Sequence, residues 1–386
     1  RLGTYYTSGN YPVTGGTPDA AIIMMFADDV TVDEDGAIFG NVELNVNHNY
    51  YLEFIGDVTF ERLEHARGNI YIGSNNLKID EYLDIGLYRY TQYTTPLPGD
   101  ADETWIETPA VSSLLRVEDI GRYDVGEANN LDQRSMIITD GNASDGGLSI
   151  KVTGNSASGE AAGTDGAENY DNINQLTYPI AFTTDGASLD LTSSGNVYYR
   201  PAQVKVSNFS DDGYITIRPV SGELKTTDLS GGEVLQHYWS VTHSDFTTVP
   251  TVAYRFYYRN REESGVADLP TGSVNESSYV PGKVLLSSPY TRSYESSTNT
   301  ETDLGGIYSL SADSDTRVII FNGDNSGTTD DDLFDFSADA PGITLENANY
   351  TAGESTRFVG APTIYYSRKL GGAQSDQNWT ANNAWS

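Results

Sequence analysis

Short runs in which apolar and polar residues alternate recur along the whole chain, whereas no sustained stripe with helical spacing is found. In Thr251–Arg259 (TVAYRFYYR), Val252, Tyr254, Phe256 and Tyr258 fall on one face of an extended strand. Gly, Asn and Asp bound these runs, as expected for strands joined by tight turns. The pattern predicts an all-β protein.

The stretch between residues 40 and 86 carries a weak internal repeat. Its units are GNVELNV from Gly40, GDVTFER from Gly56, GNIYIGS from Gly68 and NNLKIDEYLDIG from Asn75. A tight turn followed by a short strand at this interval favours a stacked β-solenoid of the parallel β-helix kind. An ordinary antiparallel meander would give a similar pattern.

The remainder of the chain predicts a different arrangement. Residues 91 to 166 are turn-rich, and the loose stretch at Gly154–Asn172 is the best candidate for a domain boundary. The longer strands after it suit immunoglobulin-like β-sandwich domains. The predicted organisation is a β-solenoid-like domain with a loop-rich end (1–165), a β-sandwich domain (173–300), further β-sandwich strands (301–365) and the start of a following module (366–386).

The amino-acid composition limits the kinds of molecule that we expect this protein to bind. Lys and Arg number 22 and Asp and Glu 55, which gives a formal net charge of −33 and excludes nucleic acid and anionic membranes as expected partners. The most apolar run, AAIIMMF from Ala20, is too short to insert into a membrane. The 27 Tyr and 12 Phe residues are enough to form cores.

The chain contains no cysteine, which excludes disulfides, thiolate metal sites and cysteine nucleophiles. Residue 1 is Arg and no signal peptide follows it, so we expect the sequence to begin inside a longer or processed polypeptide.

Both ends of the chain carry variants of one motif. TYYTSGNYPV starts at Thr4, and IYYSRKLGGAQSDQNWTANNAWS starts at Ile364; each has a Tyr-Tyr pair, Ser or Thr, and a polar linker with Gly. The second copy adds two tryptophans that the first lacks. The motif resembles the opening of repeated modules in very large cell-surface proteins of Bacteroidota, of the gliding and adhesion type exported by type IX secretion. DDVTVDEDGAIFGNVELNVN, from Asp28, is similar to the strand-rich stretch that follows it there.

A second part of the chain resembles a sandwich module of the same proteins. The matching residues are Tyr178, Pro179, Tyr199, Arg200, Pro201, Tyr238, Trp239 and Val241. The resemblance implies an extracellular location at the cell surface and partners that are neighbouring modules of the same polypeptide or other copies of it. The residues expected to make that contact are Trp379, Trp385, Tyr365 and Tyr366.

No catalytic signature is present, so we expect no enzymatic activity. His237 and His243 share strand parity and could point to one side, although partly exposed or capped histidines are far commoner than metal pairs. Calcium is the one cofactor that the sequence suggests. Its predicted ligands, in a loop rich in Gly and hard oxygen atoms, are Asp324, Asp330, Asp331 and Asp332. An alternative is that such Asp residues only cap turns.

Most tyrosines are expected in sheets and core, but the face that carries Arg255, Tyr257 and Arg259 is a candidate strip for binding glycans or a protein partner. Together these features predict a non-enzymatic structural segment of a giant adhesin or surface filament that extends and presents binding loops. One alternative is an extracellular module that binds or cleaves polysaccharide. Another is a self-assembling filament subunit, since the ends of a solenoid are unpaired.

Overall fold

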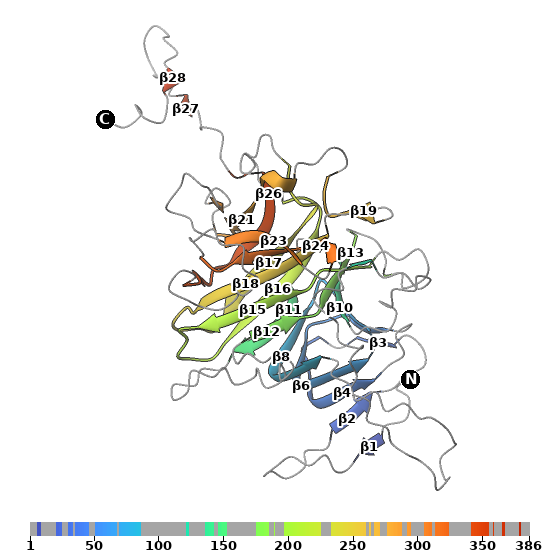
Figure 1. The fold of residues 1–386 in the computed structure, drawn as a ribbon. Coiled ribbons are helices and arrows are strands. Elements are labelled where there is room, and N and C mark those ends of the chain that lie inside the picture. The colour runs from blue at the N-terminus through green and yellow to red at the C-terminus, as the bar shows by residue number, and fades with distance from the viewer. Residues whose placement is uncertain are drawn as a thin grey trace, which may run out of the picture.

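The computed structural model shows an all-β protein with several sheets, none of them closed (Figure 1). It describes residues 6–8, 21–24, 30–33, 35–45, 51–67, 69–85, 121–122, 136–142, 146–152, 175–184, 189, 197–224, 233–259, 262–263, 266–270, 276–287, 292–294, 305–310, 313–323, 341–354, 358, 365–366 and 378–379. No helix in these ranges is long and apolar enough to cross a membrane. The all-β prediction is therefore confirmed.

The largest sheet has eleven strands. In spatial order they are β1 (Tyr6–Ser8), β2 (Ala21–Met24), β4 (Ala37–Asn45), β6 (Val58–Arg67), β8 (Asn76–Ile85), β11 (Gly147–Val152), β16 (Gly213–Ser221), β17 (His237–Ser244), β26 (Ala348–Glu354), β21 (Tyr279–Leu285) and β22 (Arg292–Tyr294). The strands from β2 to β11 pair in parallel. All other pairs are antiparallel, so the sheet changes character between β11 and β16.

A second sheet has seven strands. Their order is β3 (Val30–Val32), β5 (Tyr51–Phe54), β7 (Asn69–Gly73), β10 (Met136–Thr139), β13 (Ile180–Thr183), β14 (Val197–Tyr199) and β9 (Gly121–Arg122). The first five pair in parallel. From β2 to β8 the chain alternates strictly between the eleven-stranded and the seven-stranded sheet, one strand at a time.

A third sheet has six antiparallel strands and runs across the middle of the view in Figure 1. Its order is β12 (Gln175–Tyr178), β15 (Ala202–Ser207), β18 (Thr251–Arg259), β24 (Asp313–Phe321) and β23 (Gly305–Leu310), with β25 (Ile343–Thr344) beside β18. The described part of the chain also has two small antiparallel pairs and a 3₁₀ turn. The pairs are β19 (Glu262–Glu263) with β20 (Val266–Ala267) and β27 (Tyr365–Tyr366) with β28 (Asn378–Trp379), and the turn is η3 (Glu276–Ser278).

The weak repeat of the sequence corresponds to single strands rather than to whole structural units. Three of the four units form β4, β6 and β8 of one sheet, and the unit from Gly68 forms β7 of the other. Val42 pairs with Ile22 on one side and Leu63 on the other, so the true period is about 20 residues and contains two strands. The interval of the sequence repeat was shorter because Gly40 lies inside β4 whereas Gly56 precedes β6, and because the unit from Gly68 belongs to the other sheet.

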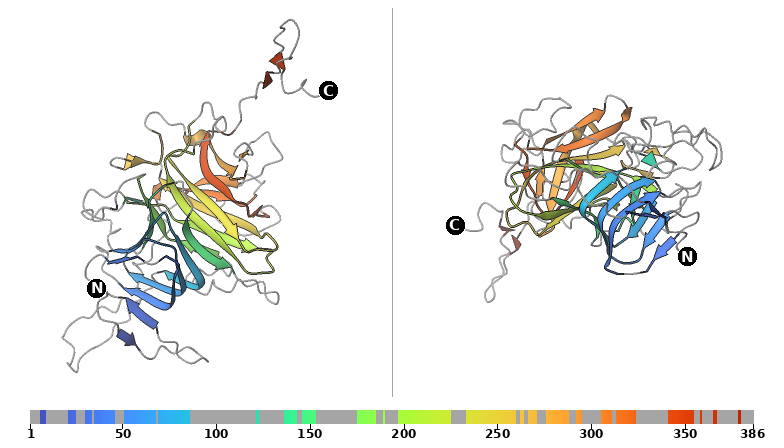
Figure 2. Two further views of the ribbon diagram at one scale, coloured as in Figure 1. Left: turned by 180° about the vertical axis from the view of Figure 1, so that it is seen from behind. Right: turned by 90° about the horizontal axis from the view of Figure 1, so that it is seen from below.

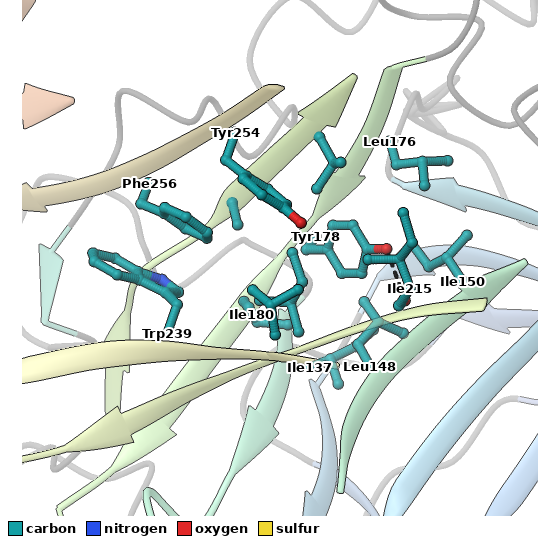
Figure 3. Packing of buried hydrophobic residues seen from close by; sticks show 14 of the residues in the cluster. Ile137, Leu148, Ile150, Leu176, Tyr178, Ile180, Ile215, Trp239, Tyr254 and Phe256 are labelled. Carbon is teal, nitrogen blue, oxygen red and sulfur yellow. Dashed lines mark hydrogen bonds between the residues drawn. The ribbon is translucent and has the colours of Figure 1, made fainter. Parts of the chain in front are cut away.

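One continuous core joins the parallel and antiparallel parts. It runs from Val42 and Leu44 through Ile137 and Tyr178 to residues near the end of the described body, such as Ala352. At the parallel end, aromatic rings from successive turns stack, and the ring centroids of Phe39 and Phe60 are 5.1 Å apart. Figure 3 shows the junction, where isoleucines of the parallel strands meet the aromatic side chains of the antiparallel ones. The predicted boundary around residues 154–172 lies outside the described residues, and the domain limits stay a prediction.

Gly56 lies at a corner where two turns of the chain approach closely. A Cβ atom on Gly56 would lie 2.5 Å from the Cα of Asp35, a distance that requires a backbone shift. Gly56→Ala is therefore expected to lower the free energy of unfolding by about 1–3 kcal/mol. Denaturant melts of the variant measure this loss. The adjacent Ile55 is 54% exposed, so Ile55→Ala should change the free energy of unfolding by less than about 0.5 kcal/mol. Equal losses of stability in the two variants would contradict the close packing at this corner.

Candidate functional site

The residues that carry the resemblance to surface-protein modules lie inside the protein. Tyr178, Tyr199, Arg200, Trp239 and Val241 are each at most 1% exposed. Pro179, Pro201 and Tyr238, which complete that set, are also buried. The Tyr178 hydroxyl donates a hydrogen bond of 2.9 Å to the carbonyl oxygen of Ile215, which links the six-stranded sheet to the eleven-stranded sheet (Figure 3). These residues therefore form core and joints rather than an exposed binding surface.

Arg200 is the centre of a buried charged cluster. It lies between β14 and β15, and its guanidinium donates to Oδ1 of Asp268 from Nε at 3.0 Å and from Nη2 at 2.8 Å. Its Nη1 donates to the carbonyl oxygen of Tyr199 at 2.7 Å. The carbonyl oxygen of Arg200 accepts from Nε1 of Trp239 at 3.1 Å. His237 completes the cluster, with Nδ1 3.2 Å from the same oxygen of Asp268.

Burial and pairing set the charges of this cluster. Burial alone would raise the pKa of Asp268, but the neighbouring Arg200 and His237 outweigh it and hold that pKa below its usual value. For His237, burial lowers the pKa, and the favourable contact with Asp268 does not fully offset the effect. The cluster therefore consists of one carboxylate, one guanidinium and one neutral imidazole.

Arg218 forms a second joint, between the parallel strands and β16. It is 1% exposed, pairs with the carboxylate of Asp140, and donates from Nε to the carbonyl oxygen of Asn142 at 2.8 Å. Its Nη1 donates to the carbonyl oxygen of Gly73 at 3.3 Å. The bond that Asn142 N donates to Asp140 Oδ1, at 3.0 Å, holds the carboxylate in place. The joint ties the ends of β7 and β10 to a strand of the antiparallel part.

Side-chain oxygens also link successive turns at one corner of the parallel stack. Oδ1 of Asp35 accepts from the backbone N–H of Asp57 at 3.1 Å, and Oδ1 of Asp57 accepts from the N–H of Asn76 at 2.7 Å. Each side chain thus satisfies a donor in the next turn, as turn-capping residues do. Asp35 therefore acts here as a turn residue.

Removing the Asp57 carboxylate is expected to lower the free energy of unfolding by about 1 kcal/mol, because Asp57→Ala leaves the Asn76 N–H and side chain without this acceptor. Asp57→Asn retains an oxygen acceptor and should lose less. Glu61, which is exposed on β6, offers a matched control: Glu61→Ala should change stability by less than about 0.5 kcal/mol. Urea titrations compare the three variants, and equal effects for Asp57→Ala and Glu61→Ala would rule out the corner contact as a stabilising one.

The predicted calcium ligands Asp324, Asp330, Asp331 and Asp332 all lie outside the described residues. Within the described ranges, no group of three or more His, Asp or Glu residues has the arrangement of a metal site. His237 and His243 both lie on β17 with the same parity, as predicted. They are about 20 Å apart along the strand, however, so they do not form a metal pair.

The predicted interaction residues are only partly described. Tyr365 of β27 pairs with Trp379 of β28, and Tyr366 pairs with Asn378. This hairpin lies apart from the large sheets in Figures 1 and 2. Trp385 lies outside the described residues.

The candidate glycan strip on β18 differs from the expectation. Tyr257 is 2% exposed, and its hydroxyl donates to Oε1 of Gln203 at 2.7 Å. The prediction of an exposed tyrosine there is wrong because the outward-facing side of the six-stranded sheet is itself buried at this point, as Lys205 and Val318 also show.

The sequence did not reveal the charged cluster as a site. Asp268 is not part of any recognisable motif, and for His237 the sequence suggested only a metal ligand or a partly exposed or capped histidine. The one signal was Arg200 itself, because an arginine set between Tyr and Pro residues of a core motif needs an acidic partner when buried.

The comparisons with known proteins give no independent assignment. No protein-family model, no curated protein and no solved structure matches this chain.

Proposed function

We propose that this chain is a structural segment of a giant bacterial cell-surface adhesin or surface filament, of the Bacteroidota type IX-secreted kind. In this proposal the alternating parallel strands form a β-solenoid, and the antiparallel strands form immunoglobulin-like sandwich layers that extend it. The segment carries no catalysis; it extends the polypeptide away from the cell and presents loops to the surroundings. Its partners are neighbouring modules or other copies of the chain.

The observation that carries the proposal is the unbroken path of packing through the molecule. The eleven-stranded sheet runs from β1 to β22, and one core spans its parallel and antiparallel parts. Buried side chains of Arg218 and Tyr178 bond across the joints between sheets. Such a body resists separation of its parts, because the side chains that donate across these joints are buried and hydrogen-bonded.

The surface charge and the motif residues support the same proposal. A formal charge of −33 keeps an extended extracellular protein soluble and repels like-charged surfaces. Calcium bound by the loop that contains Asp324 and Asp330–Asp332 would fit a secreted acidic protein, and we retain it as part of the proposal. Surface glycans remain a candidate target of the presented loops.

Single-molecule pulling tests the structural role. The chain is placed between two marker domains of known unfolding force and stretched from its ends. We expect the body to unfold in one dominant event, because the core is shared. Unfolding in many small steps at forces below those of the markers would overturn the mechanical role. Binding to a glycan array, or release of reducing ends from polysaccharides, would instead favour a glycan-directed module.

A further inference from the structure

Four polar side chains are buried together on the outer side of the six-stranded sheet. Thr177 on β12, Gln203 and Lys205 on β15, and Tyr257 on β18 are each at most 6% exposed. The chain neighbours of Thr177, Gln203 and Tyr257 belong to the main core, so these three side chains point to the opposite face of the sheet. Because buried polar groups need partners, their mutual contacts determine what this site can do.

Thr177 and Gln203 face each other across the β12–β15 ladder. They are register partners in this antiparallel pair, and Nε2 of Gln203 donates to Oγ1 of Thr177 at 3.5 Å. The ladder fixes both backbones, so the hydroxyl group stays beside the amide group. A nucleophilic oxygen that is held next to an acyl group has a high effective concentration for attack on it.

Tyr257 polarises the amide group that Thr177 faces. Its hydroxyl donates a hydrogen bond of 2.7 Å to Oε1 of Gln203. Negative charge develops on this oxygen when a nucleophile adds to the amide carbon, and a donor that is already in place stabilises that charge. Arg255, the register partner of Gln203 on β18, adds positive charge on the same side of the sheet.

We propose that Thr177 and Gln203 form an intramolecular ester bond that joins β12 to β15. In this step Oγ1 of Thr177 bonds to Cδ of Gln203, and the bond between Cδ and Nε2 breaks. The nitrogen leaves as ammonia and takes the hydroxyl proton with it. The step needs no oxidant and no second reactant, and its net change is the loss of one ammonia molecule. This inference stands on the described side chains and does not depend on the proposed function.

Lys205 provides a route for the proton. It lies diagonally opposite Thr177 in the β12–β15 ladder, a separation that a long side chain spans. Burial, with a further contribution from the charge of Arg255, lowers the pKa of Lys205. A larger fraction of its amine is therefore neutral at a given pH and able to carry the hydroxyl proton to the leaving nitrogen.

The position of the bond suits both its survival and its effect on the fold. The burial of Thr177 and Gln203 keeps water away from the ester, which protects it from hydrolysis. Among the described strands, β12 is an edge strand of the six-stranded sheet and pairs with β15 alone. The ester would therefore fix covalently a strand that ladder hydrogen bonds hold on one side only.

Mass spectrometry of the full chain tests the ester. We expect an intact mass that is lower than the mass of the sequence by one ammonia molecule. Chymotrypsin cuts after aromatic residues such as Phe182, which lies between the two positions, so after denaturation and digestion the peptides that carry Thr177 and Gln203 should remain joined. Hydroxylamine, which cleaves esters but not amides, should separate them. Asn208 also donates to a threonine, Thr251, at 3.2 Å, but it is exposed, and the peptides of this control pair should be separate.

Two variants identify the nucleophile. Thr177→Val keeps the shape of the side chain but lacks the hydroxyl, so the full mass and separate peptides are expected. Thr177→Ser retains a hydroxyl and should retain the joined peptide. The ester is overturned if the parent has the full mass, if it loses ammonia while the peptides of Thr177 and Gln203 are separate, or if joined peptides persist in Thr177→Val. The first two results are read on the parent chain, so they hold even if the valine variant does not fold.

Discussion

Replacing Arg200 by methionine is expected to lower the free energy of unfolding by about 3–5 kcal/mol, one of the largest single-site effects in this protein. Methionine fills part of the arginine volume, but it leaves the Asp268 carboxylate buried and uncompensated. It also removes the donor to the carbonyl oxygen of Tyr199. Without the guanidinium, the pKa of Asp268 should rise because its burial is no longer outweighed. Equilibrium unfolding in guanidinium chloride at pH 7.5 measures the loss.

Two companion variants make the result specific. In the double variant Arg200→Met, Asp268→Leu, both charges are absent, so a substantial part of the stability should return. Lys151 pairs with Asp212 at 3.3 Å on the surface, and Lys151→Met should change stability by at most about 1 kcal/mol. If Arg200→Met and Lys151→Met gave similar small changes in the free energy of unfolding, the buried pair of Arg200 and Asp268 would stabilise the fold no more than a surface pair does.

The second large effect is expected at Trp239, whose side chain is fully buried on β17. Its ring stacks on Phe256 with centroids 4.8 Å apart, and its Nε1 donates to the carbonyl oxygen of Arg200. Trp239→Ala would open a large cavity between the eleven-stranded and six-stranded sheets and orphan that carbonyl. We expect a loss of about 3–5 kcal/mol, measured as a shift of the denaturation midpoint.

Trp239→Phe separates packing from hydrogen bonding in this effect. Phenylalanine keeps an aromatic ring against Phe256 but cannot donate, so its loss should be clearly smaller than that of alanine. Thermal melting followed by far-ultraviolet circular dichroism ranks the two variants. Equal losses would mean that the contact with Arg200, rather than the volume of the indole, dominates at this position.

Individual strands could be predicted from the sequence because the alternation of apolar and polar residues is a local property. Thr251–Arg259 folds as β18, with Val252, Tyr254, Phe256 and Tyr258 buried on one face, as its pattern predicts. The face that carries Tyr257 was not readable, because whether an outward side is covered depends on residues distant in sequence.

The pairing of strands was harder to predict for the same reason. The repeat units from Gly40 and Gly56 do form neighbouring strands, β4 and β6, but the sequence did not show that the chain passes through β5 of another sheet between them. β5 has the sequence YLEF and is not preceded by the Gly-Asn or Gly-Asp pair that marks three of the units, so the repeat did not predict this strand. Likewise, Asp268 meets Arg200 across 68 residues of sequence, and no local pattern encodes that contact.

The place of β26 has a consequence for how the chain folds. This strand, Ala348–Glu354, lies between β17 and β21, which both precede it in sequence. The sheet therefore cannot be completed until nearly the whole described body has been synthesised, and closing it joins residues as far apart as Ser240 and Asn349. Such long-range pairing slows folding and leaves two strand edges exposed in the meantime. During synthesis from the N-terminus, the parallel strands can assemble early. The facing edges of β17 and β21 must then stay unpaired, and avoid pairing with other strands, until β26 has been synthesised.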